Sequence, residues 1–366
     1  MKLSNYPHLV QKGILAEMET SNLFLMSFVS KNMKKLIKSS QIKRFKSISR
    51  IVYYYDITPK GMVYISVKPI FHCTGRWTRV AKANEFILKM VECKEDAEND
   101  HFVLNIAGKL INFKICKKGY EDYCPVASFL PINKVSVIES IHNCLLNFFG
   151  DSIEYYWVAE DDKLFIPRLK NLSVCLRIRI GNLDKVWSTL PSSLVLKQII
   201  GWMDNPFKPE SNFYQTESIS LNLNSKRLLE VLSYFQGRQA ILTCSYSFEI
   251  RGLTEFVNRW KSGEAFQKLE YLEVLTSFGT DYEFRQTQIL NAIGVKQIDE
   301  RKTPPSHTVP RICGWRYFRP KTDPISSHTY VVRETDNRVA SISIQQTTIL
   351  FGVWNETEEE FLALVK

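Results

Sequence analysis

Side chains that could carry out chemistry occur singly in this chain or in polar surroundings. The eight cysteines stand at wide, irregular gaps and form no C-x-x-C pair. A zinc site would need ligand pairs spaced two to four residues apart. The nearest approaches are His72-Cys73 and His142-x-Cys144. Packed side chains explain these residues more simply, so we expect no metal site and reduced thiols that behave as small apolar groups.

Sequence patterns typical of enzymes are also missing. The chain has no G-x-x-x-x-G-K-[ST] loop for phosphates, no G-x-G-x-x-G after a strand, no G-x-S-x-G and no H-E-x-x-H. The acidic run Glu160-Asp161-Asp162 lies among polar residues, where such runs are usually solvated turns. No constellation would position a nucleophile, a base and an orienting group. We therefore expect no enzyme activity, no catalytic residue and no cofactor.

Length and composition favour a folded protein of about two domains. The 366 residues are 45% hydrophobic and 12% aromatic, far from the composition of a disordered chain. No apolar stretch approaches the roughly 18 residues that a membrane span needs. His8, Gln11 and Lys12 interrupt any apolar core of an export signal. These features predict an intracellular protein, cytoplasmic and/or nuclear, without a membrane partner.

Positive charge is concentrated at the N-terminus. The net charge is +10, and residues 1–50 hold ten Lys or Arg against two Glu, which leaves about +2 for the other 316 residues. The cluster Lys31, Lys34, Lys35 and Lys38 could meet phosphates or an acidic protein, but charge alone favours a solvated helix face. Nucleic-acid binding through this basic N-terminus is therefore kept only as an alternative, and nucleic acid is not the expected partner.

The first 45 residues predict three short helices that cannot complete a core. Pro7 suits a first helical turn, and Val10, Ile14 and Met18 recur at helical spacing with Leu15 alongside. Residues 23–29 are apolar on nearly every side of a second helix, which must then be covered on every side. So few residues cannot cover it. Either the rest of the chain or another protein does so, which makes Leu15–Met18 and Leu23–Phe24 a candidate partner surface.

This segment resembles the F-box. The resemblance rests on Tyr6-Pro7, on Ile14-Leu15-x-x-Met18, and on Leu23-Phe24-Leu25-x-Ser27-x-x-Ser30-Lys31. It implies docking on the Skp-type adaptor of an SCF (Skp–cullin–F-box) ubiquitin ligase, and through it on a cullin. Glu19-Thr20 stands where many members have Asp-Pro, and Thr20 or Ser21 is expected to cap the second helix. The implied adaptor-facing residues are Pro7, Leu9, Val10, Ile14, Leu15, Leu23 and Phe24.

The remaining chain predicts hairpins followed by a strand–helix repeat. Residues 51–69 and 101–116 read as hairpins, with an acidic loop at 95–100 between them, and residues 135–149 as a helix. Beyond residue 170, strand-like cores centre at 176, 198, 220, 242 and 272, with helical stretches at 226–232 and 253–260. Such spacing is typical of leucine-rich repeats, here without the asparagine ladder.

A second resemblance covers about Trp187 to Phe278. Leu253-Thr254-Glu255-Phe256-Val257-Asn258-Arg259-Trp260-Lys261-Ser262-Gly263, followed by Leu269-Glu270-Tyr271-Leu272, resembles the F-box associated domain of type 2 of nematode F-box proteins. We expect Trp260 to pack its helix on the sheet and Gly263 to end that helix. After a Pro-rich connector, a hairpin is expected over 331–354 around residues 335–338, followed by an acidic tail.

The predicted fold class is α+β, with a three-helix F-box-like module before an irregular leucine-rich-repeat-like domain. The expected divisions are 1–48 (F-box-like module), 49–150 (hairpins and helix), 151–300 (repeat-like, F-box associated domain) and 301–366 (connector, hairpin and tail). The predicted function is a non-catalytic substrate-recognition adaptor of an SCF-type ligase, with an unknown protein substrate. A repeat-domain scaffold without a ligase role is the alternative.

The alternation of side chains along the strands predicts where the repeat-like domain would bind its substrate. Side chains of a stacked sheet point alternately to the core and to the open face. Inward positions are then Leu176, Ile178, Ile180, Ile219, Leu221, Leu223, Leu272 and Val274. The substrate-binding candidates on the outward face are Arg177, Arg179, Ser220, Asn222, Tyr271 and Glu273. Outward Arg and Tyr often dominate interfaces, although plain solvated positions are the competing explanation.

Overall fold

A computed structural model describes residues 3–55, 60–67, 84–93, 101–118, 122–160, 166–177, 187, 196–203, 205, 207–244, 250–275, 282–312, 321–345 and 347–366. The acidic run 95–100, His72-Cys73, Ile178, Arg179 and Ile180 lie outside these residues. The chain forms two compact units, Met1–Val174 (unit 1) and Cys175–Lys366 (unit 2). The expected segments 1–48 and 49–150 thus belong to one unit.

Unit 1 begins with short helices. These are η1 (Leu3–Asn5), α1 (His8–Glu17), α2 (Thr20–Met26), α3 (Lys31–Ser40) and α4 (Ile42–Ser47). Pro7 stands directly before α1, and the Ser30 hydroxyl accepts a hydrogen bond from the Met33 N–H at the start of α3. The expected helical N-terminal region is therefore confirmed.

A mixed sheet and one long helix complete unit 1. Its strands follow the order β7-β1-β2-β3-β6-β5-β4, antiparallel except for the pairs β1/β7 and β3/β6. The predicted hairpins are β1/β2 and β4/β5, and the predicted helix is α5, so all three are confirmed. The bounds are β1 (Ile48–Tyr55), β2 (Lys60–Val67), β3 (Asn84–Glu92), β4 (Phe102–Ile106), β5 (Lys109–Lys118), β6 (Asp122–Phe129), η3 (Pro131–Asn133), α5 (Lys134–Phe149) and β7 (Glu154–Glu160).

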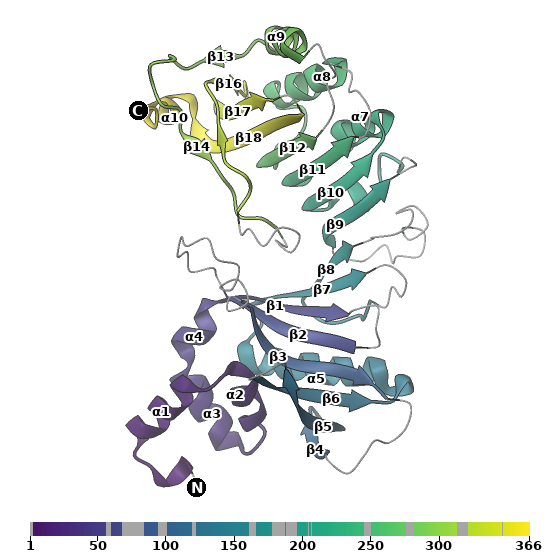
Figure 1. Ribbon diagram of the computed structural model, residues 1–366, viewed down its shortest axis with the longest axis vertical. Helices are drawn as coiled ribbons and strands as arrows, with labels where there is room; N and C mark the ends of the chain where they lie inside the picture. Colours follow the sequence, from purple (N-terminus) through teal and green to yellow (C-terminus); the bar gives the residue numbers. More distant parts are fainter. Residues whose placement is uncertain are drawn as a thin grey trace. The chain divides into compact units, whose positions relative to one another are not determined.

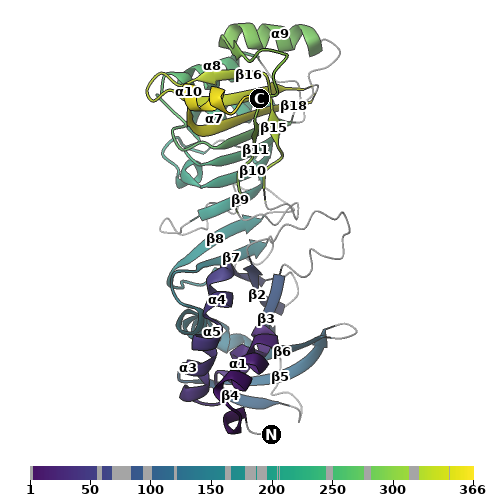
Figure 2. The same cartoon turned by 90° about the vertical axis from the view of Figure 1, so that its left-hand side faces the viewer.

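The core of unit 1 joins the N-terminal helices to α5, which lies beside them in both views (Figure 1, Figure 2). Leu23 and Phe24 of α2 are fully buried, and the Phe24 ring lies 5.7 Å from that of Phe148 on α5. Phe45 of α4 contacts the rings of Phe148 and Phe149. The second helix, which is apolar on nearly every side, is therefore covered by this chain itself. The sequence left open whether this chain or another protein covers it.

Unit 2 is built on four parallel strands, β9 to β12, that stack one after another in Figure 1. Strands β18, β17, β16 and β13 extend this sheet in antiparallel fashion, and β14/β15 form a small separate sheet. The predicted strand–helix alternation is present, but this mixed sheet is not a clear leucine-rich-repeat match. The bounds are β8 (Leu172–Arg177, at the unit boundary), β9 (Leu196–Met203), η4 (Asn212–Gln215), β10 (Ser218–Leu223), α7 (Ser225–Tyr234), β11 (Gln239–Cys244), α8 (Ile250–Lys261), β12 (Tyr271–Leu275), α9 (Tyr282–Ile293), β13 (Lys296–Gln297), β14 (Ser306–His307), β15 (Ile325–Ser326), β16 (Thr329–Val332), β17 (Arg338–Ile344), β18 (Thr348–Thr357) and α10 (Glu358–Ala363).

Aromatic residues of α8 pack the helix on this sheet. Trp260 is fully buried and its ring lies 5.2 Å from that of Phe351 on β18, while Phe256 contacts the same ring. Gly263 follows the end of α8 with a positive φ of 72°, the conformation that favours glycine after a helix. Both structural expectations for Trp260 and Gly263 are confirmed. Among the described helices, none is long and apolar enough to cross a bilayer.

Candidate partner-binding surfaces

An apolar stripe is exposed on α1. Leu9 is 81% exposed, Val10 44% and Ile14 41%, and Pro7 at the start of the helix is exposed as well. Val10 and Ile14 are four residues apart and thus share one helix face. Large apolar side chains this exposed are typical of a surface that another molecule covers. Four of the seven residues that the F-box resemblance marks as adaptor-facing are therefore exposed on α1 or at its start, with Val10 and Ile14 on one face and Leu9 about 100° around the helix from Val10.

The other three residues lie inside unit 1. Leu15, Leu23 and Phe24 are fully buried, so the expectation that they face a partner is corrected. The physical reason is that α5 and the sheet supply the cover that the first 45 residues lack. Their burial sets the positions of α1 and α2 and so supports the exposed stripe indirectly.

A polar clamp on Glu85 of β3 holds the start of α2. The Glu85 carboxylate accepts hydrogen bonds from the Thr20 N–H (2.9 Å) and the Thr20 hydroxyl (2.7 Å). Arg44 of α4 donates to the same carboxylate at 2.6 Å and to the Met18 carbonyl at 2.6 Å. Residue 19, the N-cap of α2, makes no side-chain capping bond. The sequence predicted a cap from the Thr20 or Ser21 hydroxyl, whereas the acceptor at this helix start comes from a distant strand.

The basic cluster on α3 is partly engaged. Lys38 donates from Nζ to the Asn147 carbonyl of α5 at 3.1 Å, so it links two helices. Lys31 and Lys35 are exposed, and Lys34 is half-buried. The cluster thus divides between a structural contact and a solvated helix face.

In unit 2 the expected outward face of the parallel strands is largely covered. Ser220 is buried and Tyr271 is fully buried, which corrects their assignment to an open surface. Tyr271 packs with Ile325 of β15 and Leu350 of β18. Of the other candidates, Asn222, Glu273 and Arg177 are half-buried. Sequence alternation therefore found the two faces of the strands, but could not show that a later segment covers the second one.

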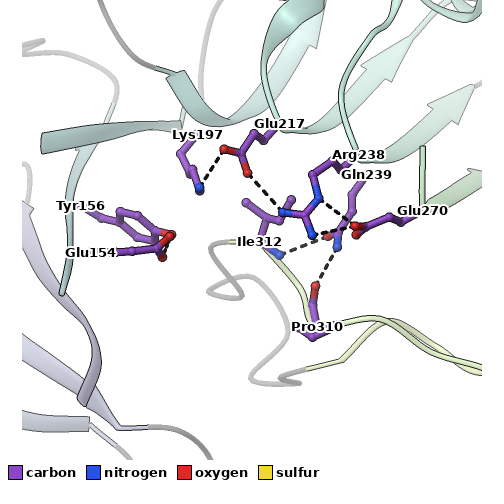
Figure 3. A network of polar contacts seen from close by, with 9 residues as sticks. All are labelled: Glu154, Tyr156, Lys197, Glu217, Arg238, Gln239, Glu270, Pro310 and Ile312. Atoms are coloured by element: carbon purple, nitrogen blue, oxygen red, sulfur yellow. Dashed lines mark hydrogen bonds and ion pairs between the residues drawn. The ribbon is translucent and has the colours of Figure 1, made fainter. Parts of the chain in front are cut away.

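Two glutamines hold the segment that covers this face of the strands, and they do so at Pro310 and Ile312. The buried Gln239 amide of β11 donates from Nε2 to the Pro310 carbonyl (2.7 Å), and its Oε1 accepts from the Ile312 N–H (3.1 Å), as Figure 3 shows. Gln198 of β9 donates to the Ile312 carbonyl at 3.1 Å. Both glutamines pair in register with Ser218 of β10. The sequence prediction did not include these two residues, although their equivalent places in two strands are a signal that could have found them.

A ladder of alternating charge links the starts of successive strands (Figure 3). Lys197 pairs with Glu217 at 2.8 Å, and Arg238 pairs with Glu217 at 3.6 Å and with Glu270 at 2.7 Å. These side chains are partly exposed, so each pair contributes at most about 1 kcal/mol. Because the charges neutralise one another, the ladder aligns the strands and offers no open charged site.

One acidic group, Glu273 of β12, is half-buried near Arg311 and Asp323. The Glu273 carboxylate accepts a hydrogen bond from the Tyr271 hydroxyl at 3.0 Å, and burial raises the pKa of Glu273. Arg311 and Asp323, which lie 3.4 Å apart, are close enough to influence this pKa. Within the described part of the chain, no three His, Cys, Asp or Glu side chains are placed to hold a metal ion.

Comparison with known proteins identifies one domain. Residues 6–45 match the F-box domain, and no curated protein or solved structure matches the chain. The chain therefore contains an F-box domain, the domain type that binds Skp-type adaptors in SCF ubiquitin ligases. The match ends before the sheet of unit 1, so it carries no information on the type 2 F-box associated domain or on unit 2.

Proposed function

We propose that this chain is a substrate-recognition adaptor of an SCF-type ubiquitin ligase. The F-box match at residues 6–45 carries the proposal. The exposure of the apolar residues Leu9, Val10 and Ile14 on α1 supports it, because exposed apolar side chains on a helix are suited to docking on another protein. The chain then acts in the cytoplasm and/or nucleus, performs no chemistry itself and raises the concentration of a protein substrate near the ligase.

The docking surface is tested with a double variant, Leu9→Asp with Ile14→Asp. Both side chains are exposed, so unit 1 stays folded while co-purification with a purified Skp-type protein is lost. Lys12→Asp on the same helix is the matched control, because it introduces a carboxylate at an exposed polar position. Undiminished co-purification of the double variant refutes the assignment of the surface. Leu15→Asp, in contrast, unfolds the N-terminal helices because it buries an unpaired charge.

Two other functions make different predictions for the same experiment. A scaffold without a ligase role would leave the wild-type chain unable to bind the Skp-type protein. A nucleic-acid-binding protein would bind through Lys31 and Lys35, and its affinity would fall steeply with salt. The apolar docking of α1 should change little with salt. Binding to a Skp-type protein and to a DNA duplex, each measured in low and high salt, therefore separates the three functions.

The substrate surface of unit 2 is proposed with fewer residues than the sequence suggested. Arg177 and Arg179 stay candidates from the strand alternation, and Asn222 and Glu273 remain partly accessible. Arg177→Ala combined with Asn222→Ala is expected to reduce substrate capture and to spare Skp-type binding. Pull-down of ubiquitinated proteins with the intact and variant chains measures this, and equal capture by both excludes the surface.

A further inference from the structure

Two of the eight cysteines stand directly opposite each other in the sheet of unit 1. Cys116 of β5 is paired with Cys124 of β6, in an antiparallel register that runs without a shift from Asn112 to Lys118. Among the described strand pairs, no other cysteine is opposite a cysteine; Cys244 of β11, for example, is paired with Leu223. Sequence spacing gave no sign of this pair, because seven residues separate the two cysteines.

The backbone at this pair has the spacing that a disulfide needs. Directly opposite residues of antiparallel strands have Cα atoms about 5.5 Å apart in a hydrogen-bonded pair and about 4.5 Å apart in a non-bonded pair. A disulfide joins residues whose Cα atoms are about 4.4–6.8 Å apart. Both kinds of pair lie within this range, so a bond between Cys116 and Cys124 requires no large movement of β5 or β6.

Burial decides which of the two cysteines an oxidant reaches first. Cys124 is a thiol in this structure, its side chain is 2% exposed, and its sulfur donates to the Pro125 carbonyl at 3.5 Å. A buried thiol is protected from oxidants in solution, because oxidation depends on exposure and on thiolate character. Cys116 is then the position at which the oxidant reacts, and Cys124 is the neighbour that resolves the product.

We propose that Cys116 and Cys124 form a reversible disulfide when the chain meets hydrogen peroxide. The Cys116 thiolate first attacks the peroxide, which gives a sulfenic acid and releases hydroxide. The Cys124 thiolate then attacks the Cys116 sulfur, and the S–OH bond breaks to release a second hydroxide. With the two thiol protons, two thiols and one peroxide give one disulfide and two water molecules. A cellular thiol such as glutathione reverses the bond by thiol–disulfide exchange, as befits a transient disulfide in a reducing compartment.

The bond would fasten β5 to the middle of the sheet of unit 1. Strand β6 pairs with β3 as well as with β5, and β3 holds the start of α2 through Glu85. A cross-link restricts the unfolded chain and so favours the folded one. The unfolding midpoint of unit 1 is therefore expected to rise by about 5 °C. This effect does not depend on the proposed ligase function.

The test uses the full chain, which is reduced with dithiothreitol, separated from it and treated with an equimolar amount of hydrogen peroxide. The thiols titrated in denaturant are expected to fall from eight per chain to six. Trypsin cleaves at Lys117, so mass spectrometry after alkylation should find the peptide of Cys116 linked to that of Cys124. The buried Cys175 and Cys244 are internal controls and stay alkylated. No linked peptide, or linkage of Cys116 or Cys124 to another cysteine, overturns the proposal.

Single serine variants test the order of the two steps. Cys124→Ser removes the resolving thiol, so peroxide should leave on Cys116 a sulfenic acid that dimedone labels. Cys116→Ser should show no label at Cys124, and peroxide should leave its unfolding midpoint unchanged. Serine is close to cysteine in size, and far-UV circular dichroism checks that each variant is folded. A label at Cys124 in place of Cys116, or an unchanged midpoint in the bridged wild type, overturns the proposal.

Discussion

Replacing Thr20 by proline is expected to destabilise unit 1, although proline normally suits this position. Thr20 is the first residue of α2, where a missing N–H costs nothing and the fixed φ favours the helix. Here the N–H and the hydroxyl both donate to Glu85, at 2.9 Å and 2.7 Å. The threonine thus gives the Glu85 carboxylate two donors that a proline at this position could not supply.

The size of the effect follows from these bonds. Hydrogen bonds to a charged group contribute about 1.5–3 kcal/mol each, and the 27% exposure of Glu85 argues for the lower end. Proline recovers about 0.4–1 kcal/mol by restricting the unfolded chain. Thr20→Pro should therefore cost about 2 kcal/mol. In a Glu85→Ala background the bonds are already absent, and the same substitution should be neutral or slightly stabilising.

A double-mutant cycle measures the difference. Urea unfolding of the wild type, Thr20→Pro, Glu85→Ala and the double variant gives the coupling, and hydrogen exchange of the α2 amides reports the local effect. Thr20→Val is the matched control, because it keeps the N–H and loses only the hydroxyl, so it should cost about 1.5 kcal/mol, the loss of one such bond. Equal destabilisation by Thr20→Pro in both backgrounds would refute the argument.

Three further changes test other parts of the fold. Gln239→Leu leaves Pro310 O and Ile312 N–H unpaired, so unit 2 should lose about 2–3 kcal/mol and the Ile312 amide should exchange faster; unchanged exchange would contradict this. Burial lowers the pKa of His142, so the neutral form is favoured in the fold. Unit 1 should become less stable as the pH falls below about 6.5, the unfolded pKa, until the lower folded pKa is reached, and His142→Gln should flatten this fall in urea midpoints. Gly263→Ala should cost more than about 1 kcal/mol in thermal unfolding because its φ is 72°, and a loss within error would exclude strain there.

Local patterns predicted the elements of both units. The Pro7 start and the spacing of Val10 and Ile14 predicted α1, and the strand pattern of residues 101–116 predicted the β4/β5 hairpin. The spacing of apolar runs predicted the parallel strands β9 to β12. Each of these features depends on residues that are close together in the sequence, within one or two helical turns or in consecutive strands. Periodicity and turn chemistry are therefore sufficient to find them.

Tertiary structure decided which surfaces remain open. Leu23 and Phe24 are buried because α5 packs on them, and Tyr271 is buried because Ile325, on a much later segment, covers it. The clamp on Glu85 joins residues 65 positions apart in the chain. A strand or helix pattern shows that a face is apolar or polar, but not which distant segment covers it. The sequence by itself thus determined the helices, the hairpins and the F-box, whereas long-range packing determined the surfaces on which a partner can bind.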